Sequence, residues 1–150
     1  MDHSIHAAEL FLQGYNCAQA VAVAFSDVTG IDKELSSRLA CSFGGGMGRM
    51  REVCGAVSGM LMVVGVLYGY AEPEEGEIKK AHYTLVQELA AKFRQEAGSI
   101  ICREILKNPP SDPNPSPRTA EYYAKRPCAR MVMTAAKLMD DFIAEHPLEG

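Results

Sequence analysis

The chain has 150 residues, of which 47% are hydrophobic and 23% are charged, and its formal net charge is -4 at pH 7. This composition is typical of one globular domain that folds without disulfides, and it excludes wholesale disorder and collagen-like structure. The net negative charge and the lack of a basic tail argue against nucleic-acid binding, which needs a basic face.

The N-terminal residues 1–6 lack the basic region and the apolar core of a secretory signal peptide. We therefore expect a cytoplasmic protein. In that reducing compartment, the five cysteines are expected to be thiols, metal ligands or redox centres rather than structural disulfides. Their odd number points the same way.

Helical periodicity predicts an all-α fold, a single-domain bundle of about six helices over residues 1–150. The first helices are expected over residues 3–13, over residues 17–28 after an Asn16 cap, and over residues 33–43 after an Asp32 cap. The glycine-rich run 44–48 then forms a tight turn.

A long apolar helix is predicted over residues 50–70, ended by Pro73. Residues 53–71 carry no charge and are nominally long enough to cross a bilayer. Their glycines lower the hydrophobicity, and the other amphipathic helices need a central partner, so we interpret the segment as a core helix rather than a membrane span. The spacing of Gly55 and Gly59 lets another helix approach closely.

The C-terminal half is expected to hold three more helical segments. These are a polar amphipathic helix over residues 75–97, a short helix from a Ser99 cap through Lys107, and a last helix over residues 127–145 with Pro127 in its first turn. Five prolines prevent a helix over residues 108–117. The four histidines, His3, His6, His82 and His146, show no ligand pairing and are expected at the surface.

Four of the five cysteines share a predicted position near a helix N-terminus: Cys17, Cys54, Cys102 and Cys128. Free backbone N–H groups and the positive end of the helix dipole stabilise a thiolate there, and thiolates bind metals and attack disulfides. Arginines flank two of the four, Cys54 and Cys128. Cys41 falls near a helix C-terminus, where the dipole disfavours negative charge.

These four cysteines also lie on the apolar stripes of their helices, so they are expected to converge in the bundle core as metal ligands do. The alternative is that they are small buried hydrophobic residues. No C-x-x-C pair occurs in the sequence. Zinc ribbons, ferredoxin-type runs and thioredoxin-type dithiols therefore have no support.

Four short segments, spread along almost the whole chain, contain or lie between the cysteines. They are Gly14–Val21 around Cys17, Phe43–Gly48, the segment Cys54-Gly55-Ala56-Val57-Ser58-Gly59, and Gly98–Glu104 around Cys102, with Cys128 after Pro127. With these motifs the chain resembles the C_GCAxxG_C_C proteins, small redox-active proteins with four characteristic cysteines. The resemblance implies a redox role for Cys17, Cys54, Cys102 and Cys128, and it leaves Cys41 outside the family set.

Three functions remain open at this point. In the first, the four cysteines bind an iron-sulfur cluster or a single metal ion, in electron transfer or redox sensing with an unknown redox partner. The second is a thiol-disulfide oxidoreductase with no metal cofactor, which needs two cysteines paired in space. The third is a non-catalytic helical interaction domain, a homodimer through small-residue helix faces.

One pair of substitutions tests the choice of cysteines. We expect Cys54→Ser to abolish the activity of the site and Cys41→Ser to be nearly neutral, because only Cys54 lies at a helix N-terminus and beside arginines. The alternative is that the glycine run folds Cys41 back towards Cys54, so that these two form a pair.

Overall fold

The computed structural model describes residues 2–73 and 76–148, and the regular secondary structure in these ranges is helical. Its elements are α1 (His3–Leu12), α2 (Cys17–Ala24), α3 (Ser26–Thr29), α4 (Lys33–Ala40), the 3-10 turn η1 (Cys41–Phe43), α5 (Gly55–Tyr68), α6 (Glu77–Ala97), α7 (Cys102–Ile105), α8 (Ala120–Lys125) and α9 (Cys128–Glu145). The predicted all-α fold is confirmed. The described ranges contain nine α-helices where about six were expected.

Several boundaries differ from those predicted. The helix expected over residues 17–28 is divided at Phe25, which ends α2 and precedes α3. The apolar helix begins at Gly55 rather than near residue 50, because Met47, Arg49 and Arg51 have positive φ angles that no α-helix accepts. Helix α8 was not predicted. The expected start of the amphipathic helix at residue 75 lies outside the described residues.

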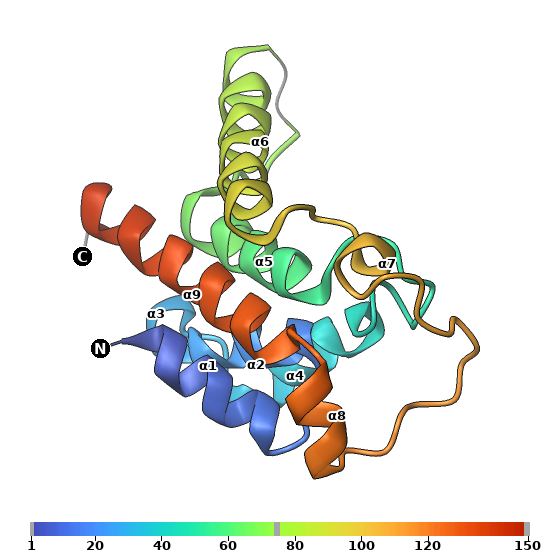
Figure 1. The fold of residues 1–150 in the computed structure, drawn as a ribbon. Helices are drawn as coiled ribbons and strands as arrows, with labels where there is room; N and C mark the ends of the chain where they lie inside the picture. The colour runs from blue at the N-terminus through green and yellow to red at the C-terminus, as the bar shows by residue number, and fades with distance from the viewer. Residues whose placement is uncertain (1, 74–75, 149–150) are drawn as a thin grey trace.

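Helix α2 lies at the centre of the bundle. It contacts α1, α4, α5 and α9 (Figure 1), and all of its residues except Cys17 and Gln19 are buried. Its alanines and valines leave little side-chain bulk, so four neighbours reach its backbone closely. Helix α6 is placed differently, because it stands out from the rest of the bundle.

The close approach predicted for the glycine spacing takes place between α5 and α2. A Cβ atom at Gly59 would lie 2.7 Å from the Ala18 carbonyl oxygen, and one at Gly55 would lie 3.1 Å from the Ala18 nitrogen. The packing of these helices therefore requires glycine at position 59 and makes position 55 tight. Among the described residues, no helix has the length and apolar character to cross a membrane.

One histidine is not at the surface as expected. His3 is buried, stacked on Phe25 with ring centroids 4.2 Å apart. Its Nδ1 lies 2.6 Å from Oδ1 of Asp140 and its Nε2 lies 2.9 Å from Oδ1 of Asp27. The residue thus joins α1 to α3 and α9, and it does so at the end of α9 opposite to Cys128.

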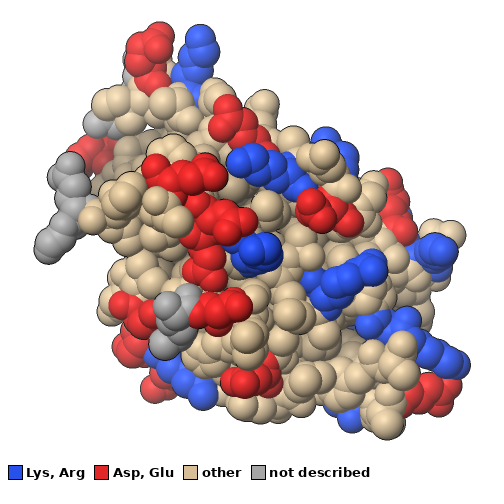
Figure 2. Space-filling model, turned by 60° about the vertical axis from the view of Figure 1, so that its left-hand side comes forward, with Lys and Arg blue, Asp and Glu red and all other residues tan. Residues whose placement is uncertain are grey.

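The surface carries charges of both signs. On the face in Figure 2, Asp and Glu side chains lie beside Lys and Arg side chains, and basic groups do not merge into a continuous patch. Three exposed pairs on helices have the i,i+4 spacing: Arg38 with Glu34, Lys125 with Glu121, and Lys137 with Asp141. Such pairs contribute little to stability.

Candidate functional site

Four cysteines meet at one small cavity in the interior. This cysteine cavity has a volume of about 60 Å³, and its lining includes Cys17, Cys54, Cys102 and Cys128. Three of them are buried and Cys17 is half-buried. Cys41 is exposed and does not line the cavity. The structure therefore brings together the four cysteines that the sequence singled out and leaves the fifth outside.

Cys17 and Cys128 are each the first residue of a helix. Asn16 caps α2 with a capping box, in which Oδ1 of Asn16 accepts from the Gln19 backbone and Oε1 of Gln19 accepts from the Asn16 backbone. Cys128 opens α9 directly after Pro127, which fixes the entry of the chain into the helix. Both sulfurs thus start from well-fixed backbone at positive helix ends.

Cys54 and Cys102 are placed by a short antiparallel pairing that the sequence did not predict. Val53 and Ile101 form an isolated β-bridge. On either side of it, the Cys54 nitrogen donates to the Ile100 carbonyl at 2.7 Å and the Cys102 nitrogen donates to the Glu52 carbonyl at 2.6 Å. Since side chains alternate along extended backbone, the two cysteines project to the same face of the bridge.

These bonds also revise the expected helix starts. Cys54 is the N-cap residue of α5 rather than a residue inside its first turn, and α7 begins at Cys102 rather than after Ser99. The Ser99 hydroxyl instead accepts from the Ile101 nitrogen at 3.0 Å. The nitrogens of both cysteines are used in the bridge, so these residues start their helices without offering their own N–H groups to the site.

Three arginines line the cysteine cavity: Arg51, Arg118 and Arg126. Arg51 is 3% exposed; its Nε donates to the Pro110 carbonyl at 2.9 Å and its Nη1 to Sγ of Cys102 at 3.7 Å. Its Nη2 is buried and has no hydrogen-bond partner. Arg118 and Arg126 both lie over the ring of Tyr122, at 5.0 and 4.8 Å from its centroid.

Cys17 and Cys128 line the same cavity, and each thiol affects the ionisation of the other. The hydrogen bond from Cys17 stabilises the Cys128 thiolate and lowers the pKa of Cys128 to about 7, against the effect of burial. The positive charges of Arg126, Arg118 and Arg51 lower this pKa further. The same hydrogen bond, together with burial, holds the pKa of Cys17 well above its usual range. Cys128 is therefore the thiol of the pair that ionises first and is about half thiolate at pH 7, whereas Cys17 stays protonated.

The other two cysteines of the site are protonated thiols. Burial raises the pKa of Cys54 to about 12. Burial also raises the pKa of Cys102, although the hydrogen bond and the charge of Arg51 oppose this effect. The expectation that all four positions favour a thiolate is thus wrong for three of them. A helix end contributes only about 0.3 to 1 kcal/mol, which the desolvation of a buried charge exceeds.

The four thiols are the donors of a metal site, but their side chains are not placed around a common metal position. Four thiols are the ligands that zinc and iron-sulfur clusters use. Within residues 2–73 and 76–148, however, no group of three or more His, Cys, Asp or Glu side chains is placed to hold a metal ion.

Arg118 is the residue of the site that sequence reasoning missed. Its two terminal nitrogens donate to the carbonyls of Phe11 and Tyr15 at 3.1 Å, so it ties the end of α1 to the segment before α8. It lies just after the proline-rich segment, in no periodic pattern and far from any cysteine in sequence. The feature of the sequence that could have indicated Arg118 is the spacing of Arg118, Tyr122, Tyr123 and Arg126, which allows cation–π stacking.

Comparisons with known proteins agree with this site. The sequence matches the family described as "Putative redox-active protein (C_GCAxxG_C_C)" over residues 15–142. No curated protein and no solved structure matches the chain. The matched range includes all four cysteines of the cavity and both segments of the β-bridge, and it covers most of the chain. The chain therefore belongs to the C_GCAxxG_C_C family of redox-active proteins.

Proposed function

We propose that the protein works through a reversible dithiol–disulfide couple formed by Cys17 and Cys128. The observation that carries this proposal is that the two cysteines line one cavity, where their interaction lowers the pKa of Cys128 to about 7 and raises the pKa of Cys17. An attacking thiol works best when its pKa is near the ambient pH, and a second thiol in contact is needed to resolve the intermediate. The spatial pairing replaces the C-x-x-C motif that the sequence lacks.

The reaction follows from these two roles. The Cys128 thiolate attacks one sulfur of a substrate disulfide and forms a mixed disulfide, while the other substrate sulfur leaves as a thiolate. Sγ of Cys17 then attacks Sγ of Cys128, and the second half of the substrate leaves and takes up the Cys17 proton. Two protein thiols are oxidised to one disulfide and the substrate disulfide is reduced to two thiols. A small dithiol resets the pair by the reverse exchange.

Disulfide mapping tests the proposal. The reduced protein is treated with a small disulfide, digested under acid conditions and analysed by mass spectrometry. We expect a Cys17–Cys128 disulfide that dithiothreitol removes. Cys17→Ser should trap the mixed disulfide on Cys128, whereas Cys128→Ser should lose the reaction. Cys54→Ser is the matched control and should still form the disulfide, contrary to the expectation from the sequence that it abolishes the activity, because burial keeps Cys54 a protonated thiol outside the proposed pair. A Cys17–Cys128 bond that never forms in the folded protein would overturn the proposal.

A second candidate is an iron-sulfur cluster or metal ion held by Cys17, Cys54, Cys102 and Cys128, in electron transfer or redox sensing. The convergence of four thiols on one cavity favours it, as do the three arginines that would offset the negative charge of four thiolates. It requires the sulfurs to move from their present spacing. Protein purified without oxygen should then contain iron and sulfide or zinc, and Cys54→Ser should lose them. Metal-free protein with an intact dithiol couple leaves only the first proposal.

A further inference from the structure

A second hollow adjoins the cysteine cavity and shares part of its lining. This arginine cleft has a volume of about 300 Å³ and is lined by the glycine turn, by prolines of the 108–117 segment and by Arg49, Arg51, Arg118 and Arg126. Asn16, Tyr122 and three of the arginines line both hollows. A molecule seated in the cleft therefore lies against the same side chains that surround Cys17 and Cys128.

The cleft has a strong excess of positive charge. Among the described residues that line it, four are arginines and none is acidic. The ion pairs found in the described ranges involve other residues and include none of these four arginines. Asp112 lies near Arg49, but its carboxylate accepts from the Asn114 nitrogen at 3.0 Å and is not part of the lining.

The guanidinium groups are held in place by the protein. Arg49 donates to the Asp112 carbonyl at 2.8 Å and to the Ser116 hydroxyl at 3.2 Å, and Arg126 donates to the same hydroxyl at 3.4 Å. Neutral oxygens thus fix these arginines, and no ion pair within the described ranges involves them. Positioned guanidinium groups of this kind suit carboxylate recognition, because each presents several N–H donors in one plane.

One buried N–H group of Arg51 has no acceptor among the described residues. The residue is 3% exposed and lines both the cleft and the cavity, and its Nη2 has no hydrogen-bond partner. A buried N–H group of a charged side chain is costly to leave unpaired, so native structures nearly always satisfy it. Arg51 lines both hollows, so an anionic ligand that extends from the cleft towards the thiols would contact this side chain.

We propose that the arginine cleft binds the carboxylate group of a small anionic disulfide and that this class of molecule is the substrate of the Cys17–Cys128 pair. The reaction rests on the proposed function, but the binding of the carboxylate does not. The cleft is at the lower end of the volumes of small-molecule sites, which suits a compact ligand rather than a folded protein domain. Its positive charge raises the local concentration of such a substrate at the thiolate.

Three probe disulfides of nearly the same size separate charge from reactivity: the anionic dithiodipropionate, the neutral bis(hydroxyethyl) disulfide and the cationic cystamine. Each oxidation rate of the pair is divided by the rate of the same probe with free mercaptoethanol. We expect the normalised rate to be about tenfold higher for the anionic probe than for the cationic probe, and the difference to shrink in high salt. Equal normalised rates would overturn the proposed substrate class.

Arg49 provides the matched variants, because it lines the cleft but not the cysteine cavity. Arg49→Gln should lower the ratio of the anionic-probe rate to the neutral-probe rate, whereas Arg49→Lys should keep this ratio. Arg38→Gln removes the same charge from the exposed face of α4 and should have no effect. If Arg49→Gln kept the full preference for the anionic probe, the arginine cleft would not be the source of this preference, and the proposal would be contradicted.

Calorimetry with dithiodipropionate separates this inference from the proposed function. In the triple variant Cys17→Ser, Cys41→Ser, Cys128→Ser, which removes the proposed pair and the exposed thiol that lines the cleft, the probe should still bind, and Arg49→Gln in that background should weaken binding. Binding without disulfide formation in the wild type would contradict the proposed function and leave the cleft assignment intact. Disulfide formation without binding would do the opposite.

Discussion

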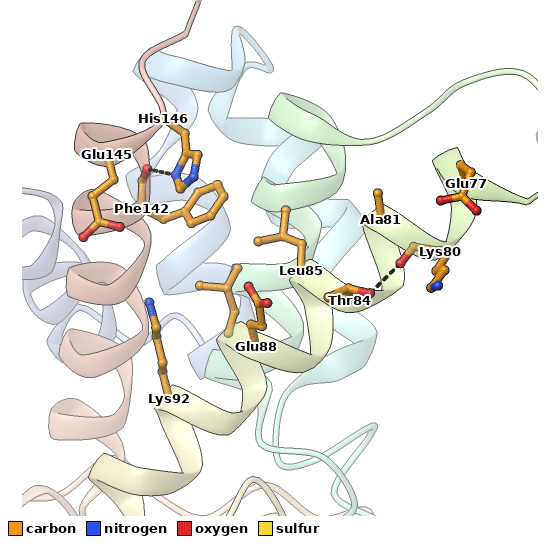
Figure 3. Close-up of a pocket in the computed structure, with 11 residues that line it drawn as sticks. Glu77, Lys80, Ala81, Thr84, Leu85, Glu88, Lys92, Phe142, Glu145 and His146 are labelled. Atoms are coloured by element: carbon orange, nitrogen blue, oxygen red, sulfur yellow. Dashed lines mark hydrogen bonds between the residues drawn. The ribbon is translucent and has the colours of Figure 1, made fainter.

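The cleft between α6 and α9 has a volume of about 540 Å³, whereas the cysteine cavity has about 60 Å³. The larger hollow is lined by charged side chains of both signs and by apolar ones such as Leu85 and Phe142, which face each other across it in Figure 3. No cysteine lines it. In this molecule the reactive groups gather at the smaller hollow, so volume is a poor guide to chemistry.

The two regions differ because they are packed differently. Helix α6 has two buried residues, Leu89 and Phe93, so it rests on the bundle through a narrow contact and leaves a wide gap beside α9. Around the cysteines, helices α2 and α5 are in backbone contact at Gly55 and Gly59. Close packing removes water from the thiols, which raises the pKa values of Cys54 and Cys102. The interaction with Cys17 and the arginine charges lower the pKa of Cys128 against this effect.

The largest expected effect is a contrast in reactivity among the thiols of the small cavity. Because Cys128 has a pKa of about 7 and Cys54 a pKa of about 12, their thiolate fractions at pH 7 differ by several powers of ten. Cys128 should react with iodoacetamide at a rate that rises with pH and levels off above about pH 7. Cys54 should stay unmodified in the folded protein. Mass spectrometry of each alkylated cysteine against pH measures both.

Two variants sharpen this contrast. Arg126→Gln should move the Cys128 midpoint to higher pH, because its positive charge stabilises the thiolate. Lys92→Gln, in the α6–α9 cleft, should leave the midpoint unchanged. A Cys128 midpoint at or above about 8.5, the ordinary thiol pKa, would show that the Cys17 hydrogen bond does not stabilise the thiolate.

A second prediction concerns the difference in packing along α5. At Gly59 an added Cβ would meet the Ala18 carbonyl oxygen at 2.7 Å, whereas at Gly65 it would meet nothing within 4 Å. Gly59→Ala should lower the free energy of unfolding by about 1–3 kcal/mol through overpacking. Gly65→Ala, on the same helix, should raise it by about 0.5–1 kcal/mol by reducing backbone freedom. Urea denaturation measures both, and equal values would contradict the tight contact of α2 with α5.

The parts of the site that follow local rules could be predicted from the sequence. Asn16 followed by Gln19 is a capping box, and Pro127 marks a first turn, so the positions of Cys17 and Cys128 at helix starts are local properties. The apolar stripes of the helices likewise allowed the all-α fold to be predicted. These features depend on residues within one or two helical turns.

The remaining features depend on contacts between distant segments. The bridge of Val53 with Ile101 involves one residue pair and leaves no alternating pattern to detect. Arg118 reaches the site by bonding to carbonyls of α1 and the following turn, far away in sequence. The expected stabilisation of a thiolate was wrong for three cysteines, because the interaction with Cys128 and burial raise the pKa of Cys17, and burial raises the pKa of Cys54 and Cys102. Burial depends on tertiary packing, which the position of a residue at a helix end does not predict.

The smallest effect is expected at Cys41, which lines the arginine cleft but neither the cysteine cavity nor the α6–α9 cleft. Its Sγ donates to the Arg38 carbonyl at 3.1 Å and its side chain is exposed. A serine hydroxyl donates the same bond, so Cys41→Ser should change the free energy of unfolding by no more than about 0.5 kcal/mol. Its carbonyl accepts from the Asn16 side chain at 3.1 Å, a backbone contact that the substitution keeps. Disulfide mapping should still give the Cys17–Cys128 bond in this variant, together with urea denaturation unchanged from the wild type. If Cys41→Ser lost reversible thiol oxidation as completely as Cys128→Ser, the redox pair would have to include Cys41, and a Cys41–Cys54 pair joined through the glycine turn would replace the one proposed.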